Sequence, residues 1–411
     1  MPDKKFCLIG QSLPHTFSPE IHSFFGLDYS VEEIRNVEAL ENFLKTTDYD
    51  GFNVTIPYKR DIIPLLNHVS KEALEMGAVN TVVKKDGEWY GYNTDIYGIR
   101  YALKQAGIEV KGKKVAILGS GGTSHMANYA LKDEAREVIV VSRIGEINYN
   151  NIYDIKEIDV IINATPVGMY PNNEPTPIDL EKMPSVKGVF DAIYNPLRTT
   201  LLLKAEELGI ARANGLGMLV EQARVARDIF TGEESDESLS DRVLNELYKR
   251  KRNIVFIGMP GSGKTTFGRA IAKELGKEFV DTDDEIVKRE GMSIPKIFEE
   301  KGEEYFRQLE INVIAEVSAK FNQVISTGGG VPLNVDNRRN IRHNGFVIFV
   351  DRPVETLETD GRPLSLSMDL RVMFDRRMPI YLKSKDAQIF CDGNIERTLE
   401  RIRSVLWKRY L

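Results

Sequence analysis

One glycine-rich segment has the residue types and spacing needed to bind the phosphates of a nucleotide. Residues 258–266 read Gly-Met-Pro-Gly-Ser-Gly-Lys-Thr-Thr, between an apolar run at 253–257 that predicts a buried parallel strand and a stretch with helical spacing. Glycines let consecutive backbone amides converge on phosphate oxygens, and the N-terminus of the following helix adds positive potential. We expect Lys264 to reach the β- and γ-phosphates and Thr265 to bind Mg²⁺, so a chance structural turn is the weaker interpretation. The loop's other predicted nucleotide-binding residues are Gly261, Ser262, Gly263 and Thr266.

Two aspartates follow the next predicted strand, at its C-terminal end. Asp281 and Asp283 alternate along the chain there. One carboxylate can serve Mg²⁺ through water, while the other can face a substrate hydroxyl. Capping of the next helix is the alternative, and one aspartate can do both.

Further along, a cation and three glycines could hold an anionic ligand. Arg307 and Glu310 have the i, i+3 spacing of a helix, which gives either a surface ion pair of little energetic weight or an arginine held toward a ligand carboxylate. A buried strand ends in Gly328, Gly329 and Gly330, which allow a ligand to approach the backbone closely.

In the N-terminal part, short polar residues interrupt apolar strands at their ends, where α/β folds bind ligands. Asn53 and Thr55 lie on one face of the strand predicted over 51–56, and Lys59 follows in the turn. Each alone is more typical of a turn, but together they offer the amides, hydroxyls, cation and carboxylate that a polyhydroxylated acid requires. Further residues of this kind are Asn80, Thr94 and Asp95.

Two hydroxyls stand at a predicted strand-to-helix turn near the N-terminus. Thr16 and Ser18 precede Pro19, and Ser-Pro is typical of a helix start, with Ser18 as N-cap and proline in the first turn. Capping alone would explain Ser18. The hydroxyls are also available to a ligand carboxylate.

A second glycine-rich turn predicts a dinucleotide site. It follows a strand at 113–118 and leads into a helix ending at Leu131, although a plain α/β turn can look the same. The next strand ends in Ser142-Arg143, where an NAD site would place an acidic residue. Arg143 suits a 2′-phosphate and therefore NADP, unless it is only a solvated surface residue. The residues of this turn are Gly119, Ser120, Gly121, Gly122 and Thr123.

The totals exclude several classes of protein. A chain of 411 residues, with 42% hydrophobic and 28% charged residues, predicts two or three ordinary globular domains. A net charge of -6 argues against a general nucleic-acid or membrane-surface binder. The only cysteines, Cys7 and Cys391, are far apart, the histidines show no zinc spacing, and we find neither a signal peptide nor a bilayer-spanning run. We expect a cytoplasmic protein.

The N-terminal motifs, residues 14–19, 53–59, 78–81 and 93–95, resemble those of shikimate dehydrogenases, with Thr16 where the family usually has serine. The resemblance implies that Lys59 and Asp95 form the proton-transfer pair. It also implies that Gly215 and Met218 lie by the nicotinamide, and that Tyr194 faces the substrate rather than the core. Gln222 would bind substrate rather than occupy an ordinary solvated helix position. The implied substrate-binding residues are Thr16, Ser18, Asn53, Thr55, Asn80, Tyr194 and Gln222.

The C-terminal motifs, residues 281–283, 306–310, 328–330, 361–364 and 377–381, resemble those of shikimate kinases. The resemblance implies that Asp283 is the partner of the phosphorylated hydroxyl and that Arg362 comes from a lid to neutralise the transferring phosphoryl group. Residues 357–362 contain no clear counterpart of the arginine that the family stacks on adenine. The implied grip on the shikimate carboxylate comes from Arg307, Arg377 and the Gly329–Gly330 backbone.

Together the resemblances predict an α/β fold with four parts. These are a substrate domain at 1–97 completed by 215–235, a Rossmann-type NADP domain at 98–214, an acidic, Ser-rich linker at 236–252, and a P-loop kinase domain with a parallel sheet at 253–411.

The predicted activity is NADPH-dependent reduction of 3-dehydroshikimate to shikimate, then Mg²⁺- and ATP-dependent phosphorylation of shikimate. The partners would be small molecules rather than nucleic acid or a membrane. Two alternatives stay open: a quinate- and NAD-dependent enzyme fused to another small-molecule kinase, and a metabolite-binding scaffold without turnover. Arg143 and the Arg307/Arg377 pair oppose the first alternative. The second is opposed by the intact residues Lys59, Asp95, Lys264 and Asp283.

Overall fold

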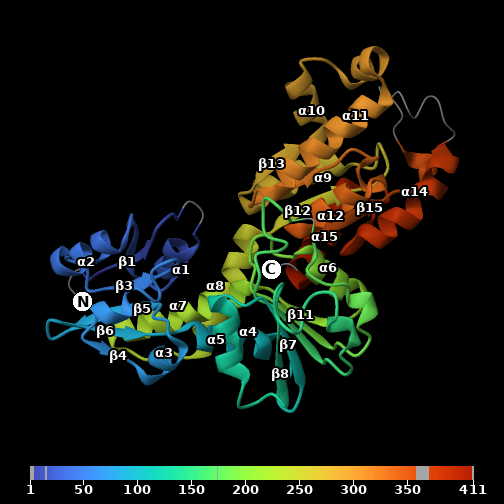
Figure 1. The fold of residues 1–411 in the computed structure, drawn as a ribbon. Helices are drawn as coiled ribbons and strands as arrows, with labels where there is room; N and C mark the ends of the chain where they lie inside the picture. The colour runs from blue at the N-terminus through green and yellow to red at the C-terminus, as the bar shows by residue number, and fades with distance from the viewer. Residues whose placement is uncertain (1–3, 14–15, 174, 358–369, 410–411) are drawn as a thin grey trace. The chain divides into compact units, whose positions relative to one another are not determined.

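The computed structural model describes residues 4–13, 16–173, 175–357 and 370–409 (Figure 1). The chain forms two compact units, which we call unit 1 (Met1–Asn195 and Lys204–Leu244) and unit 2 (Pro196–Leu203 and Asn245–Leu411). No helix in the described part of the chain combines the length and the apolar character that a membrane crossing would need.

The first sheet of unit 1 is mixed and has the strand order β2-β1-β3-β5-β6-β4. β5 runs antiparallel to both β3 and β6, and the other neighbours are parallel. Its strands are β1 (Lys5–Gly10), β2 (Asp28–Glu33), β3 (Gly51–Val54), β4 (His68–Val69), β5 (Thr81–Lys85) and β6 (Glu88–Tyr92). Its neighbouring helices are α1 (Ser18–Phe24), α2 (Val37–Thr46) and α3 (Lys71–Met76).

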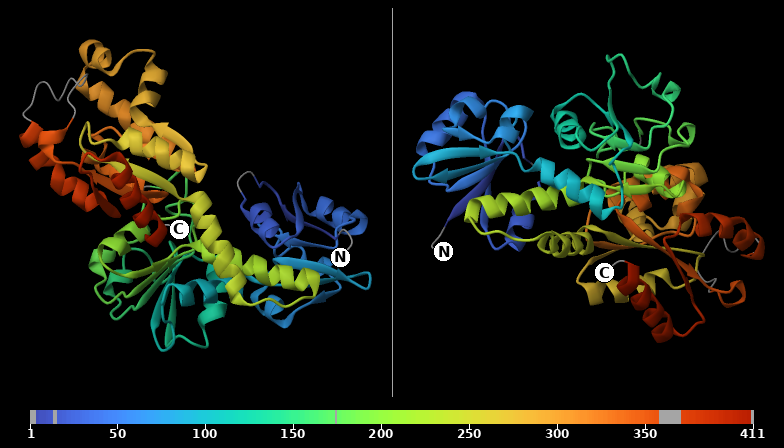
Figure 2. Two further views of the ribbon diagram at one scale, coloured as in Figure 1. Left: turned by 180° about the vertical axis from the view of Figure 1, so that it is seen from behind. Right: turned by 90° about the horizontal axis from the view of Figure 1, so that it is seen from below.

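A helix from much later in the chain packs against this sheet. α7 (Gly215–Thr231) runs beside the blue N-terminal sheet in both views of Figure 2. Phe230 of α7 stacks on Phe6 of β1 with ring centroids 4.6 Å apart. Gly51 of β3 leaves room for it, because a Cβ there would lie 2.9 Å from the Phe230 ring. The sheet that carries Asn53 is therefore held in place by a helix that also carries Gln222.

The second sheet of unit 1 is parallel throughout, with the order β11-β10-β9-β7-β8. Ile117 and Ile162 are fully buried beneath α4 and α5, as expected for strands covered by helices. The strands are β7 (Lys114–Leu118), β8 (Glu137–Val141), β9 (Val160–Asn163), β10 (Gly188–Asp191) and β11 (Ala211–Ala213). The helices are α4 (Asp95–Gln105) and α5 (Gly122–Leu131), and α6 (Thr200–Glu207) belongs to unit 1 from Lys204 onward.

A helix, α8 (Glu237–Lys251), occupies the stretch expected to be a linker. Its acidic side chains accept hydrogen bonds from α4. The Tyr101 hydroxyl lies 2.6 Å from an Asp241 oxygen, and the Lys104 ammonium lies 2.6 Å from a Glu237 oxygen. Val243 and Leu247 are buried. The acidic composition of this stretch predicts a solvated linker. In the structure, its acidic side chains instead accept hydrogen bonds from α4.

Unit 2 contains a parallel sheet with the order β13-β14-β12-β15-β16. The strands are β12 (Asn253–Ile257), β13 (Glu278–Asp281), β14 (Gln323–Ser326), β15 (Gly345–Asp351) and β16 (Ala387–Phe390). The helices are α9 (Lys264–Leu275), α10 (Thr282–Glu290), α11 (Ile294–Ala319), α12 (Val335–His343), α14 (Leu370–Ser384) and α15 (Ile395–Arg409).

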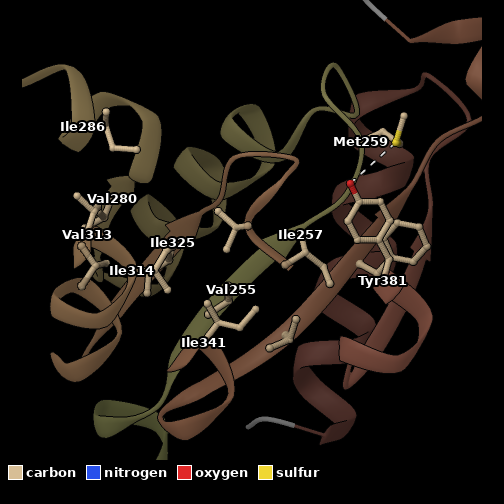
Figure 3. Packing of buried hydrophobic residues seen from close by; sticks show 14 of the residues in the cluster. Val255, Ile257, Met259, Val280, Ile286, Val313, Ile314, Ile325, Ile341 and Tyr381 are labelled. Atoms are coloured by element: carbon tan, nitrogen blue, oxygen red, sulfur yellow. Dashed lines mark hydrogen bonds between the residues drawn. The ribbon is translucent and has the colours of Figure 1, made fainter. Parts of the chain in front are cut away.

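Alternation along β12 supplies two apolar cores, one on each face of this sheet. Ile254 and Phe256 pack with residues of α9 and α15. Val255 and Ile257 pack on the other face, and Figure 3 shows them among residues of β14, α12 and α14. Both faces of the strand before the phosphate-binding loop are therefore buried, which fixes where that loop begins.

Candidate active sites

In unit 1, the structure brings the predicted proton-transfer pair into contact. The Lys59 ammonium lies 2.7 Å from Oδ2 of Asp95, and the two side chains are 29% and 14% exposed. Asp95 begins α4, and the Lys59 carbonyl accepts a hydrogen bond from the Val79 amide. Two elements far apart in sequence thus aim one cation and one carboxylate at the same point, and both remain accessible.

Two asparagine side chains hold the Lys59–Asp95 pair in place. Asn80 donates from Nδ2 to Oδ1 of Asp95 at 2.9 Å and accepts from the Thr94 amide at 2.8 Å. Asn53 donates to the Asn80 carbonyl at 3.1 Å, and both asparagines are buried. Thr55, one residue past β3, is half-buried. Five of the predicted polar residues therefore form one connected network, which consists of Asn53, Lys59, Asn80, Thr94 and Asp95.

The two predicted hydroxyls near the N-terminus contact each other. Oγ1 of Thr16 lies 3.1 Å from Oγ of Ser18 and accepts a hydrogen bond from the Ser18 amide. The prediction that Ser18 caps α1 is wrong, because the helix begins at Ser18 and Phe17 is the N-cap residue, without a side-chain cap. The capping explanation for Ser18 therefore falls away.

Tyr194 lies next to this turn. Its ring packs on Phe17 with centroids 5.2 Å apart, and burial raises the pKa of its hydroxyl above the ordinary value. The side chain is only half-buried, so it is not a core tyrosine. The arrangement places Thr16, Ser18 and Tyr194 in one neighbourhood.

The start of α7 lies against the loop that carries Tyr194. The Gly215 amide donates to the Ile193 carbonyl at 3.0 Å, and a Cβ on Gly215 would overlap the Ala192 carbonyl. Met218 packs closely on Gly98 of α4. Gln222 is buried rather than solvated, and its Oε1 lies 3.4 Å from the Thr94 hydroxyl. The predicted nicotinamide-side and substrate-side residues of α7 therefore adjoin the Asn80–Asp95 network.

The dinucleotide turn has the geometry that a pyrophosphate requires. Gly119 has φ +109°, in the region that favours glycine, and Gly121 is the N-cap residue of α5. A Cβ on Gly121 or Gly122 would point into open space, so a ligand can approach the backbone. Ser120 is exposed and Thr123 half-exposed in the same turn. These residues fit a bound dinucleotide.

Arg143 follows β8 and is exposed, with half-buried Ser142 before it. This is the end of the strand next to β7, where the ribose of a dinucleotide is expected. The position fits an arginine contact to a 2′-phosphate.

In unit 2, the phosphate-binding loop lies between β12 and α9. Gly263 has φ +96° and caps α9, which begins at Lys264. The Lys264 ammonium donates to the carbonyls of Gly258 and Met259 at 3.1 and 2.9 Å, so it is held within the loop. The Ser262 amide donates to the same Met259 carbonyl at 3.2 Å, and Thr266 lies in the first turn of α9. The loop has the conformation that an oligophosphate requires.

Thr265 and Asp281 fit a magnesium site. The Thr265 hydroxyl donates to Oδ2 of Asp281 at 2.8 Å and lies 3.2 Å from the Ser326 hydroxyl. Oδ1 of Asp281 also accepts from the Asp283 amide at 3.0 Å and caps α10, so the predicted capping is confirmed, and Oδ2 faces Thr265, where magnesium binding stays a prediction. No cluster of three or more His, Cys, Asp or Glu side chains suited to a metal occurs in the described residues. Mg²⁺ would therefore take further oxygen ligands from phosphate and water.

Most of the predicted kinase residues line a single cavity of about 300 Å³. It opens between the phosphate-binding loop and the ends of β13 and β14. Its lining includes the predicted residues Gly261, Lys264, Thr265, Asp281, Asp283, Arg307, Gly329, Gly330 and Arg377. Arg362 lies outside the described residues.

A buried carboxylate organises one end of this cavity. Both oxygens of Glu310 lie 3.2 Å from Nη1 of Arg307, and the Glu310 side chain is 3% exposed. The pKa of Glu310 is raised to about 7, because burial outweighs the opposing effect of Arg307, and Asp283 adds a smaller rise. The Arg307–Glu310 spacing therefore marks a half-buried arginine held at the cavity, not a surface ion pair.

The glycines after β14 bring backbone close to the arginines. A Cβ on Gly330 would lie 2.6 Å from Nη1 of Arg307, and one on Gly328 would lie 2.7 Å from Oδ1 of Asp283. The Tyr381 hydroxyl donates to the Gly329 carbonyl at 2.6 Å, and burial raises its pKa to about 12. Arg377, one turn before Tyr381, is buried. An anion in this cavity would meet two guanidinium groups and the glycine backbone.

Some lining residues escape sequence reasoning. Phe298 and Phe306 form an apolar wall, and Ser326 contacts the magnesium-site hydroxyl. Phe298 looks like an ordinary core residue in sequence, and no local signal separates it from that class, whereas Phe306 belongs to the 306–310 motif but was given no role there. Ser326 closes a buried strand, and this polar end of an apolar run is the signal that could have found it.

Comparisons with known proteins agree with this geometry. The family model of the shikimate dehydrogenase substrate binding domain matches residues 8–82, and that of shikimate kinase matches residues 260–406. A shikimate dehydrogenase (NADP(+)) from Caldicellulosiruptor bescii is 41% identical over 257 residues, 55% of this chain and 89% of that protein.

Solved structures resemble the N-terminal part. A chorismate mutase/shikimate 5-dehydrogenase fusion protein from Clostridium acetobutylicum matches with a TM-score of 0.57 and 33% identity, covering 60% of this chain and 98% of that one. A shikimate 5-dehydrogenase from Thermus thermophilus, in complex with NADP(H) and shikimate, matches with a TM-score of 0.54 and 31% identity over 59% and 99% of the two chains. The chain therefore belongs to the shikimate dehydrogenase family, and its residues 260–406 form a shikimate kinase domain.

Proposed function

We propose that this chain is a bifunctional enzyme that makes shikimate in unit 1 and phosphorylates it in unit 2. The observation that carries the proposal is that one chain contains both the Lys59–Asp95 pair and a cavity lined by Lys264 and Asp283. The substrates would be 3-dehydroshikimate with NADPH and then shikimate with MgATP.

In unit 1, Lys59 would donate a proton to the substrate oxygen as the C3 carbonyl is reduced. NADPH, when bound at the Gly119–Thr123 turn, supplies the hydride. Asp95 holds the ammonium in position through a contact of 2.7 Å, and Asn80 in turn holds Asp95 through a hydrogen bond of 2.9 Å. Thr16, Ser18 and Tyr194 would bind the ring carboxylate through hydroxyl groups.

In unit 2, Asp283 would accept the proton of the 3-hydroxyl as that oxygen attacks the terminal phosphate. Lys264 and a Mg²⁺ ion held through Thr265 and Asp281 would stabilise the charge on the phosphates. Arg307, Arg377 and the Gly329–Gly330 backbone would hold the carboxylate at the other end of the cavity.

A coupled assay tests both halves. With 3-dehydroshikimate, NADPH and MgATP, the wild-type chain should consume NADPH and release shikimate 3-phosphate. Lys59→Ala should lower the kcat of the reduction by roughly 10²–10⁴-fold, more than it weakens substrate binding, since it removes the proton donor. Lys71→Ala is the matched control, because Lys71 is exposed and pairs with Glu75. Near-normal turnover of Lys59→Ala would contradict the assignment.

Asp283→Asn should abolish phosphoryl transfer but leave nucleotide binding, so shikimate should accumulate in the same assay. Asp284→Asn is the control, because its side chain is 72% exposed. Retained transfer in Asp283→Asn would remove Asp283 from the mechanism. Replacing NADPH by NADH, and 3-dehydroshikimate by the quinate-series substrate, tests the competing specificity that Arg143 opposes.

We also propose a cytoplasmic location, supported by the two cysteines. Cys7 and Cys391 are buried free thiols, and burial raises the pKa of Cys7 far above its ordinary value. Such thiols are inert structural residues, as is common in reducing compartments.

A further inference from the structure

The described cavity of unit 2 occupies only one side of the phosphate-binding loop. Its lining residues come from the loop, the ends of β13 and β14, and helices α11 and α14. In the sheet order β13-β14-β12-β15-β16, β15 and β16 lie on the other side of β12. Ligands of parallel α/β sheets bind beyond the carboxyl ends of the strands. A nucleotide whose terminal phosphate faces Asp283 must therefore extend over the ends of β15 and β16.

The end of β15 lies directly against the loop. Gly258, the first residue of the loop, has a positive φ, and a Cβ there would come within 2.6 Å of the Val350 carbonyl of β15. Cross-strand pairing continues up to this point, since Ile257 is in register with Phe349. A side chain that follows β15 is therefore within reach of a ligand bound to the loop.

Arg352 is the first residue after β15. Its Nη1 donates to the Gly261 carbonyl of the loop at 3.1 Å, and its Nε lies 3.3 Å from the Thr356 hydroxyl. That hydroxyl in turn donates to the Pro353 carbonyl at 2.9 Å and closes a single 3₁₀ turn. The guanidinium is thus fixed on the loop, and it is not among the residues that line the predicted shikimate cavity.

We propose that Arg352 is a nucleotide-binding residue that contacts the phosphates of ATP and ADP on the β15 side of the loop. The inference rests on the proposed phosphoryl transfer and adds a cation that the phosphate-loop motif does not contain. A guanidinium offers donors in a fixed planar fork that matches phosphate oxygens. Its bond to the Gly261 carbonyl anchors that fork at the loop whose backbone is expected to bind the same phosphates.

Arg352→Met in the full-length chain tests this role. The Kd for MgADP, measured by calorimetry, and the KM for ATP should each rise about ten- to a hundredfold, because a charge-assisted contact to phosphate is lost. The KM for shikimate should change less than about twofold, and AMP binding less than ADP binding, since the lost contact is to the outer phosphates. Arg352→Lys keeps the charge and should recover part of the ADP affinity.

Arg371→Met is the matched control, because Arg371 forms an exposed ion pair with Glu355 in the neighbouring segment. It should bind ADP as the wild type does. Wild-type ADP affinity in Arg352→Met would overturn the proposal, as would an equal loss of shikimate and ADP binding, which would mean that the loop has simply collapsed. If the wild-type chain binds ADP through Arg352 but does not phosphorylate shikimate, the proposed function fails while this inference stands.

Discussion

The two candidate sites would hold the same ring with different chemistry. In unit 1 the proposed substrate-binding groups are hydroxyls and amides, together with one ammonium that is paired with one carboxylate at 2.7 Å. In unit 2 a single cavity collects two arginines, a lysine and three carboxylates. Hydrogen bonds between neutral groups contribute about 0.5–1.5 kcal/mol each and those to charged groups about 1.5–3 kcal/mol.

The difference follows from the two reactions. Reduction of a carbonyl needs one proton donor, and a second strong cation near it would compete for the substrate oxygen. Phosphoryl transfer brings a carboxylate and an oligophosphate into the same cavity, so each anion needs its own cations. Arg307, Arg377, Lys264 and Asp283 all line this cavity, and the arginines and the lysine come from different elements. Charge placement, not charge alone, separates the two anions.

The largest effect we predict concerns a charge in unit 2 that serves folding rather than catalysis. Arg198 contacts both oxygens of Asp386 at 3.0 and 3.3 Å, and the two side chains are each 13% exposed. Burial alone would raise the pKa of Asp386, but Arg198 holds it below the ordinary value. Arg198→Met should destabilise unit 2 by about 3–5 kcal/mol, because it removes the cation that is hydrogen-bonded to a buried carboxylate.

Loss of kinase activity along a urea titration measures this effect. Arg403→Met is the control, because its ion pair with Glu274 is exposed, and it should cost less than about 1 kcal/mol. The dehydrogenase activity of Arg198→Met should survive to higher urea than its kinase activity. An unchanged kinase midpoint would show that the buried pair does not stabilise the unit.

The second prediction tests whether guanidinium groups recognise the carboxylate in unit 2. Arg377→Met should raise the KM of the kinase for shikimate about ten- to a hundredfold, with little change in the KM for ATP, because one charge-assisted contact is lost. Arg376→Met, an exposed neighbour on α14, is the control. If both variants behave alike, carboxylate recognition in unit 2 lies elsewhere, and the contrast with unit 1 is lost.

Local chemistry explains what the sequence predicts well. The phosphate-binding loop, the strand at 253–257 and the helix ending at Leu131 depend on residues adjacent in the chain, and all are found as predicted. Asp281 could be assigned two jobs because capping and magnesium binding both depend on its place at a strand end.

Features that depend on distant partners were not predictable. The start of α1 differs because the Thr16 hydroxyl, rather than that of Ser18, accepts the local amide hydrogen bond. α8 is ordered because α4, far away in sequence, donates to its acidic side chains. The buried state of Glu310 depends on the apolar packing of α11, which spacing alone does not reveal.

The third prediction concerns recognition by hydroxyls in unit 1. Ser18→Ala should raise the KM for 3-dehydroshikimate about two- to tenfold, because one neutral hydrogen bond is lost. Ser23→Ala on the same helix is the control, because its hydroxyl is exposed and bonds to the Glu20 carbonyl. Kinase KM values should not change in either variant. A loss as large as that of Arg377→Met would show that the two sites do not differ in the way we infer.

The smallest predicted effect is a pH dependence confined to unit 2. The pKa of Glu310, about 7, lies above its ordinary value of 4.5 because of burial. Above pH 7 the ionised carboxylate neutralises Arg307, and below pH 7 the neutral form leaves that cation to the substrate. The KM of the kinase for shikimate should therefore be a few-fold lower at pH 6 than at pH 8. The KM for 3-dehydroshikimate, measured in the same chain, should lack this step.

Titration of Glu310 should also make the stability of the folded chain depend on pH. Glu310 holds its proton more tightly in the folded chain than in the unfolded chain. The contribution of Glu310 to the free energy of unfolding is therefore greatest below pH 4.5 and falls as the pH rises toward 7. Glu310→Gln should remove both this slope and the KM step. Glu303→Gln should keep both, because Glu303 is the exposed partner of Arg307, with a side chain 60% exposed. If Glu310→Gln retains the KM step, another group titrates in the cavity, and the arginine end of unit 2 is not tuned by a buried carboxylate.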